Sequence, residues 1–169
     1  MQRKTRYLTQ SAVIAALYVV LVYVTNLFPG QLNYGMIQFR LSEALCILPV
    51  FTPAAIPGLF LGCLISNFMS PLTWVDWVFG SGATLLAALL TYALRKYPWT
   101  APIPAILVNA LIIGPELYFM GFIQVNGGVG LVALLASIGS VFIGQLVVCA
   151  GLGYPLMHLL KKSKVFPPL

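Results

Sequence analysis

The chain has 169 residues, of which 60% are hydrophobic and only 7% are charged, and its mean hydropathy is +0.98. A soluble domain of this length needs far less apolar surface, so a soluble globular protein is excluded. The net charge of +6 does not indicate a nucleic-acid surface, because eight of the nine Lys and Arg residues lie in short clusters beside apolar runs. These runs do not alternate as barrel strands do, and the composition predicts an all-α polytopic membrane protein.

The charge clusters set the number of membrane crossings. They are Arg3, Lys4 and Arg6; Arg95 and Lys96; and Lys161, Lys162 and Lys164. By the positive-inside rule we place all three in the cytoplasm, so an even number of crossings separates each cluster from the next. The turn-rich stretches "PGQLNYG", "TPAAIPG" and "QVNGGVG" divide the apolar runs. The sequence thus predicts one transmembrane domain, residues 1–169, with both termini cytoplasmic.

Six transmembrane helices follow from these divisions. We expect them over residues 7–28, 36–51, 57–69, 76–95, 101–120 and 131–160. The first run is too long for a signal peptide and is not followed by a convincing small-residue cleavage site. The second and third helices are shorter than the roughly 20 residues of a standard span.

Three features of the sequence could suggest a hydrolase site, a phosphate loop or a metal site, but their positions and spacing do not support any of these. Ser66 and His158 belong to opposite ends of the predicted bundle, so they cannot form a hydrolase site. The "GGVG" of residues 127–130 has no Lys and Ser/Thr after it and is not a phosphate loop. The cysteines Cys46, Cys63 and Cys149 lack metal-ligand spacing. We therefore expect no enzyme activity, no metal and no cofactor, and ATP hydrolysis for active transport would come from a partner.

Polar residues inside the apolar segments are the main functional signal. The stretch "IQFRLSEALCILPVF", residues 37–51, carries Arg40 and Glu43 on one face of an apolar helix. Under the predicted topology every acidic residue of the chain lies in the outer half of the membrane, as does Arg40. Ionisable side chains there usually face the bundle interior and have a partner. Arg40 and Glu43 could also be a purely structural ion pair.

We interpret this polar layer as a binding pocket for a flat polar molecule. Asn109 lies two helical turns below Glu116 on nearly the same face, and tryptophans rim the layer. The tryptophans could instead belong to the aromatic belt at the membrane interface. The candidate substrate-binding residues are Arg40, Glu43, Asn67, Trp74, Asp76, Trp77, Asn109, Glu116 and Tyr118.

Small residues recur four apart in several helices, which lets helix backbones approach closely. The pairs are Ser11 and Ala15, Ala12 and Ala16, Gly58 and Gly62, and Ala83 and Ala87. For most of these pairs we expect packing inside the bundle.

The stretch "QFRLSEALCILPVFTPAAIPGLFLGCLISNF", followed by "DWVFGSGATLLAALLTY", resembles the queuosine-precursor transporter (QueT) family. Members of this family are substrate-binding S-components of energy-coupling factor (ECF) transporters, and the resemblance extends over about residues 9–158. It implies the ECF S-component fold, a site that opens outward, and the plasma membrane of a prokaryote. It also implies a transmembrane coupling subunit and two ATPase subunits as partners. The opening "SAVIAALY" resembles the docking element, so Ala12 and Ala16 are expected to contact the coupling subunit.

The resemblance further implies a substrate class, the 7-deazaguanine precursors of queuosine or queuine itself. A carboxylate can accept two hydrogen bonds from the N1–H and amino group of such a base, and an aromatic ring can stack on its flat face. An S-component for another vitamin, such as riboflavin or thiamine, is the alternative. A membrane enzyme or a structural subunit is the alternative from another class.

Overall fold

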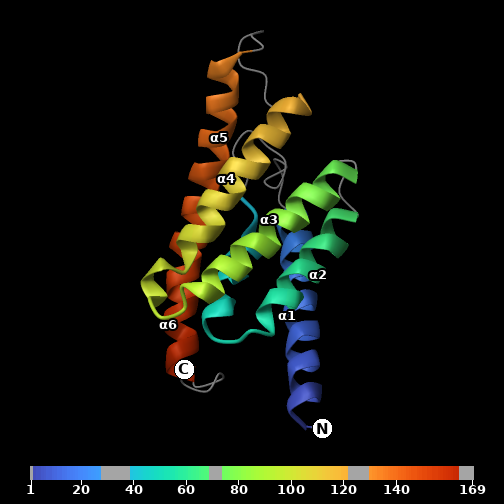
Figure 1. Cartoon of the computed structure of the whole chain (residues 1–169), viewed down its shortest axis with the longest axis vertical. Coiled ribbons are helices and arrows are strands. Elements are labelled where there is room, and N and C mark those ends of the chain that lie inside the picture. Colours follow the sequence, from blue (N-terminus) through green and yellow to red (C-terminus); the bar gives the residue numbers. More distant parts are fainter. Residues whose placement is uncertain (1, 28–38, 69–73, 122–129, 164–169) are drawn as a thin grey trace.

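The computed structural model describes residues 2–27, 39–68, 74–121 and 130–163. Every regular element within these ranges is helical. The predicted breaks at residues 29–35 and 124–129 lie outside the described ranges. Figure 1 shows the helices packed side by side as a bundle, elongated along the vertical axis of the view.

Four helices among the described residues are long and apolar enough to cross a membrane. They are α1 (Gln2–Leu27), α3 (Trp74–Ala93), α4 (Pro102–Phe119), and a continuous helix of α5 (Leu131–Gln145), η3 (Leu146–Leu152) and α6 (Gly153–Ser163). Two shorter apolar segments complete the bundle, η1 (Leu41–Val50) and α2 (Ala55–Phe68). The chain is a polytopic membrane protein, and among the described residues a helical segment lies in each of the six predicted regions, four of them long enough to cross a membrane.

Three described segments differ from a regular α-helix, and the shortest of them is the 3₁₀ turn η2 (Pro98–Thr100). The segment η1 is a 3₁₀ helix of ten residues, and η3 is a π-helix of seven. A 3₁₀ helix rises about 2.0 Å per residue against about 1.5 Å in an α-helix, so η1 reaches about 20 Å where an α-helix would reach about 15 Å. Pro49, inside η1, has no N–H to donate to an α-helical hydrogen bond. Nearly all of η1 is buried, so neighbouring helices surround this irregular segment.

The contact between α1 and α2 is built from the small residues noted in the sequence. A Cβ on Gly58 would lie 2.8 Å from the carbonyl oxygen of Ser11, and one on Gly62 would lie 2.9 Å from that of Ala15. The Ser11 hydroxyl also donates a hydrogen bond of 2.8 Å to the Ala54 carbonyl. Neither glycine leaves room for a side chain, and the prediction that these residues let two backbones approach closely is confirmed.

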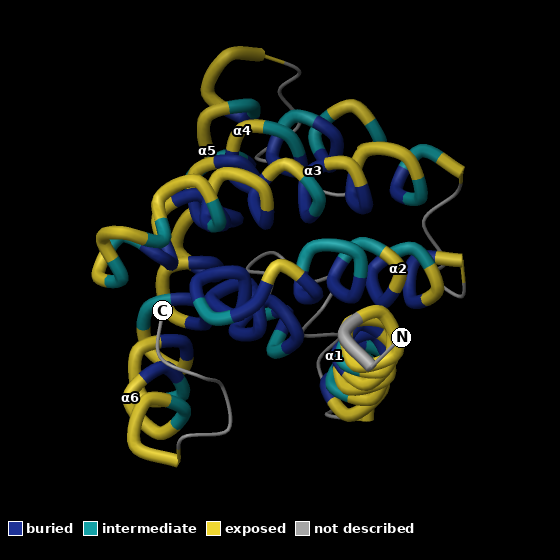
Figure 2. The backbone as a smooth tube through the Cα atoms, turned by 60° about the horizontal axis from the view of Figure 1, so that its bottom comes forward, coloured by how far each residue is buried: buried dark blue, intermediate teal, exposed yellow. Residues whose placement is uncertain are grey.

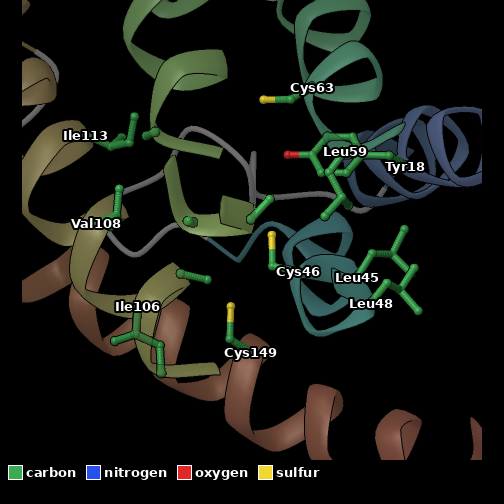
Figure 3. Packing of buried hydrophobic residues seen from close by; sticks show 14 of the residues in the cluster. Tyr18, Leu45, Cys46, Leu48, Leu59, Cys63, Ile106, Val108, Ile113 and Cys149 are labelled. Carbon is green, nitrogen blue, oxygen red and sulfur yellow. The ribbon is translucent and has the colours of Figure 1, made fainter. Parts of the chain in front are cut away.

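The core lies where η1 is enclosed by the other helices. Buried side chains from α1, η1, α2, α4 and η3 meet there, including Tyr18, Cys46, Leu59, Val108 and Cys149. Figure 3 shows the Tyr18 hydroxyl and the sulfur of Cys63 pointing toward the middle of this group. The outward faces of the long helices are exposed (Figure 2), and many of their exposed side chains are large and apolar, as expected of a surface that faces lipid.

The ends of the helices show which segments share a side of the bundle. In Figure 1, α1 begins, α3 turns into α4, and α6 ends toward the lower end of the molecule. These three places carry the basic clusters, with Lys4 in the first turns of α1, Arg95 after α3, and Lys161 in the last turn of α6. The first turn of α3 and the last turn of α4 lie at the opposite end. The three basic clusters therefore lie toward the same end of the bundle, which agrees with an even number of crossings between one cluster and the next.

Candidate functional site

A layer of buried polar side chains crosses the bundle. All three acidic residues of the chain belong to it, and each is less than a tenth exposed. Its buried members are Arg40, Glu43, Asn67, Asp76, Asn109 and Glu116, which come from η1 and its N-terminal flank, α2, α3 and α4. All six were predicted from the sequence as site residues. Charged and amide groups removed from water require partners, so their contacts indicate what each one does.

Arg40 pairs with Asp76 of another helix. Its Nη2 lies 3.5 Å from Oδ1 of Asp76, a long contact in which the two side chains are 9% and 1% exposed. Asp76 stands in the first turn of α3, where the helix dipole favours a negative charge. The sequence left open whether Arg40 pairs with Glu43 three residues along, and the ion pair in the structure instead ties the start of η1 to the start of α3.

Glu43 is held by protein donors on both carboxylate oxygens. The Tyr18 hydroxyl donates a bond of 2.6 Å to Oε1, while Asn109 Nδ2 (3.2 Å) and the Cys46 thiol (3.0 Å) donate to Oε2. The Cys149 thiol donates to the backbone carbonyl of Glu43 at 3.5 Å. Glu43 therefore joins η1 to α1, α4 and η3 at the centre of the bundle.

Tyr18, which donates a hydrogen bond to Glu43, was not among the residues predicted from the sequence. It is 1% exposed and lies in the middle of α1, within an otherwise apolar stretch. A tyrosine hydroxyl buried in a membrane helix needs a hydrogen-bond partner, and this requirement is the signal that could have indicated its role.

Asn67 fastens the end of α2 to the start of α3. Its Nδ2 donates to the backbone carbonyl of Asp76 at 2.9 Å and lies 3.5 Å from the Cys63 sulfur. Gly80 permits this close approach, because a Cβ there would lie 2.6 Å from Asn67 Nδ2 and 2.7 Å from Asp76 Oδ1. The amide of Asn67 thus positions the carboxylate that pairs with Arg40.

Several buried polar atoms of this region have no hydrogen-bond partner among the described residues. They are Oε1 and Oε2 of Glu116, Oδ2 of Asp76, Nε1 of Trp77, and the hydroxyl oxygens of Ser42 and Ser81. Buried polar atoms in proteins are nearly always paired, so these atoms are the candidates in this region for contacts with a polar ligand.

The predicted aromatic residues have different surroundings. The half-buried Trp77 packs its ring against Phe68 with centroids 4.7 Å apart. Trp74 is 66% exposed at the start of α3, a position that also suits the aromatic belt. Tyr118 is half-buried and makes an edge-to-face contact with Phe119. The contacts described here bring neither Trp74 nor Tyr118 to the buried acids.

Ala12 and Ala16 are both exposed on α1. Their neighbours Ser11 and Ala15 are buried and face the glycines of α2, so the two pairs lie on different faces of one helix. The alanine face is therefore open to a partner.

Other reactive groups of the chain have structural surroundings. The Ser66 hydroxyl donates to the Gly62 carbonyl at 2.8 Å, and His158 is exposed on α6. Among the described residues no group of three or more His, Cys, Asp or Glu side chains could hold a metal ion. An open groove beside α6 is lined by His158, Tyr154 and other α6 residues, and it holds none of the predicted site residues.

Comparison with known proteins places the chain in a family. Residues 8–162 match the family model described as QueT transporter. The queuosine precursor transporter QueT of Lactococcus lactis subsp. cremoris (strain MG1363) is 42% identical over 83 residues, which are 49% of this chain and 47% of that protein. The chain thus matches about half the length of this curated relative, and no solved structure matches it. The family match covers nearly the whole helical bundle and the buried polar layer within it, and the chain belongs to the QueT transporter family.

Proposed function

We propose that the chain is the substrate-binding S-component of an ECF transporter and takes up queuosine precursors, either 7-deazaguanines or queuine. The observation that carries this proposal is the match of residues 8–162 to the QueT transporter family, supported by the name of the Lactococcus relative. The protein would lie in the plasma membrane of a prokaryote, with both termini in the cytoplasm and the polar layer reached from outside.

The chemistry of the buried polar layer suits a 7-deazaguanine. The N1–H and exocyclic amino group of the base are donors that a carboxylate accepts together, and Glu116 and Asp76 have buried oxygens without protein partners. The carbonyl of the base needs a donor, and the indole N–H of Trp77 is a buried donor in the same region. The ligand would supply the hydrogen bonds that these atoms do not receive from the described protein residues.

The exposed small-residue face of α1 supports a docking role. Ala12 and Ala16 are exposed beside the exposed apolar side chains of Val13 and Leu17, and small residues of this kind allow a partner helix to pack closely. We propose that the transmembrane coupling subunit docks there and that two ATPase subunits supply the energy for uptake.

Analysis of the bound small molecule tests the substrate. The chain, expressed with its coupling and ATPase subunits, is purified, denatured, and the released molecule identified by mass spectrometry. A 7-deazaguanine or queuine is expected, whereas riboflavin or thiamine would assign the same architecture to another substrate and refute this one.

Tryptophan at both alanine positions tests docking. We expect Ala12→Trp with Ala16→Trp to abolish uptake in cells and copurification of the ATPase subunits, while the isolated protein still melts and binds ligand like the parent. The matched control, Ser11→Trp with Ala15→Trp, places the same bulk against Gly58 and Gly62 and should lower the melting temperature instead. Parallel loss of ligand binding and uptake in the double variant would show that the alanine face is internal.

A further inference from the structure

The cations and the carboxylates of the chain are separated in the bundle. All three acidic side chains belong to the buried polar layer. Four cations lie toward the lower end of Figure 1, where Arg95 and Lys96 follow α3 while Lys161 and Lys162 stand in the last turn of α6. None of the four makes an ion pair with a described residue. The counter-charge for these cations therefore has to come from another molecule.

The two clusters come together because α6 packs against the connection between α3 and α4. The Tyr154 hydroxyl of α6 donates a hydrogen bond of 2.6 Å to the carbonyl of Trp99 in η2. Met157 of α6 packs with Ala101, which follows η2. Lys161 lies two helical turns beyond Tyr154 on nearly the same face of α6. The cations on the two sides of this contact are called the basic corner and are Arg95, Lys96, Lys161 and Lys162.

The surface beside the basic corner suits the interface of a membrane. Tyr97 and Trp99 are 60% and 64% exposed, and such aromatic residues are enriched at the level of the lipid headgroups. An open groove follows α6 and is lined by Tyr154, Pro155, Met157, His158, Leu159 and Lys161. The groove is thus mostly apolar and has a lysine at one end. A phospholipid complements both parts with an acyl chain and a phosphate, whereas an acidic protein segment complements only the charge.

Arg95 is held in place and can still bind a phosphate. Its guanidinium carbon lies 4.1 Å from the centroid of the Tyr92 ring, and Nη1 donates a hydrogen bond of 3.1 Å to the Tyr92 carbonyl. The other N–H donors of the guanidinium are left, and its planar fork matches a phosphate through two of them. An oriented cation without a carboxylate partner is suited to an anion from outside the chain.

We propose that the basic corner binds an anionic phospholipid of the adjacent leaflet. The phosphate lies among the four cations, and an acyl chain follows the apolar groove of α6. The basic corner is remote from the candidate substrate site, so this inference does not depend on which substrate the chain carries. Failure of the proposed function would leave it standing.

The fluorescence of Trp99 can measure lipid binding at the basic corner. Trp74→Phe with Trp77→Phe leaves Trp99 as the only tryptophan of the chain. The full-length double variant is reconstituted in phosphatidylcholine with a small fraction of phosphatidylglycerol or phosphatidylcholine that carries a nitroxide quencher near the headgroup end of an acyl chain. Phosphatidylglycerol should bind beside Trp99 at least about fivefold more tightly than phosphatidylcholine, since each nearby Lys or Arg contributes about this factor. Equal quenching by the two lipids would overturn the proposal.

Two matched charge variants in this background assign the site. Lys161→Gln with Lys162→Gln should reduce the preference for phosphatidylglycerol by at least about fivefold. The control, Lys4→Gln with Arg6→Gln, removes the same charge from the exposed start of α1 and should leave the preference unchanged. Equal losses in both variants would show a diffuse surface potential in place of a site and refute the proposal.

Two further measurements exclude other occupants. Excess inorganic phosphate should leave the quenching by phosphatidylglycerol unchanged, and displacement of the labelled lipid would assign the basic corner to a soluble phosphate. The Lys161 and Lys162 variant should also copurify with the coupling and ATPase subunits like the parent. Loss of these subunits with an unchanged lipid preference would assign the basic corner to a protein partner and overturn the lipid site.

Discussion

The hydrogen bond from Tyr18 to Glu43 is the most direct test of the bundle's polar centre. Tyr18→Phe removes one hydroxyl and preserves the ring, so it leaves Oε1 of Glu43 buried without the 2.6 Å bond that it now accepts. Hydrogen bonds to charged groups contribute about 1.5–3 kcal/mol. For a chain of this length, a loss of about 2 kcal/mol lowers the melting temperature by about 4–8 °C.

Labelling of the cysteines can measure the melting temperature of Tyr18→Phe. All three are free and buried, so a thiol-reactive fluorescent dye should label the protein only as it unfolds. The matched control is Tyr7→Phe on the same helix, which removes a 3.4 Å bond from an exposed hydroxyl to the Pro53 carbonyl and should shift the midpoint by less than about 1 °C. If Tyr18→Phe shifts the melting temperature no more than this control, Glu43 is not stabilised by Tyr18.

Two other predictions concern the link between α2, α3 and η1. Gly80→Ala places a Cβ against Asn67 and Asp76, so we expect a loss of about 1–3 kcal/mol in the free energy of unfolding in the same melting assay and weaker ligand binding in isothermal titration. Gly82→Ala, where a Cβ meets nothing within 4 Å, should be neutral or slightly stabilising, and equal loss in both variants would refute the steric argument. Arg40→Met leaves the buried Asp76 carboxylate unpaired and should cost about 3 kcal/mol. Adding Asp76→Met should restore the melting temperature without restoring binding, and a double variant that binds normally would remove the pair from the site.

Hydrophobicity and charge predicted most of the fold because a helix that spans a membrane must be apolar and because basic residues gather at one face of the membrane. Apolar runs bounded by basic clusters predicted which segments are helical and which ends lie together. The described residues have a helical segment in each of the six predicted regions, and four of these segments are long enough to cross a membrane. The hydrogen-bond register of a helix is not coded in hydrophobicity, so the 3₁₀ geometry of η1 and the π geometry of η3 could not be predicted.

The polar layer was predictable in composition but not in pairing. Charged and amide residues stand out in an apolar sequence, which is why Arg40, Asp76 and Glu116 could be named as candidates. Their partners depend on how helices far apart in the sequence are packed. Arg40 is three residues from Glu43 but pairs with Asp76, 36 residues away, and Glu43 bonds to Tyr18, 25 residues before it.

The π-helical turn of η3 constrains the length of the chain at that point. It sets the rotation of α6, whose Gly153 approaches Ile47 (a Cβ there would lie 3.1 Å from its Cγ2) and whose Met157 packs with Val50 and Ala101. A π-helical turn holds one residue more than an α-helical turn, so removing one residue within 146–152 would let this stretch become α-helical with α6 in register. Inserting one residue would instead turn α6 by about 100° and carry both contacts away from η1. The constraint on length is therefore one-sided: a single-codon insertion there would disengage α6 from the centre of the bundle, whereas a single-codon deletion would not.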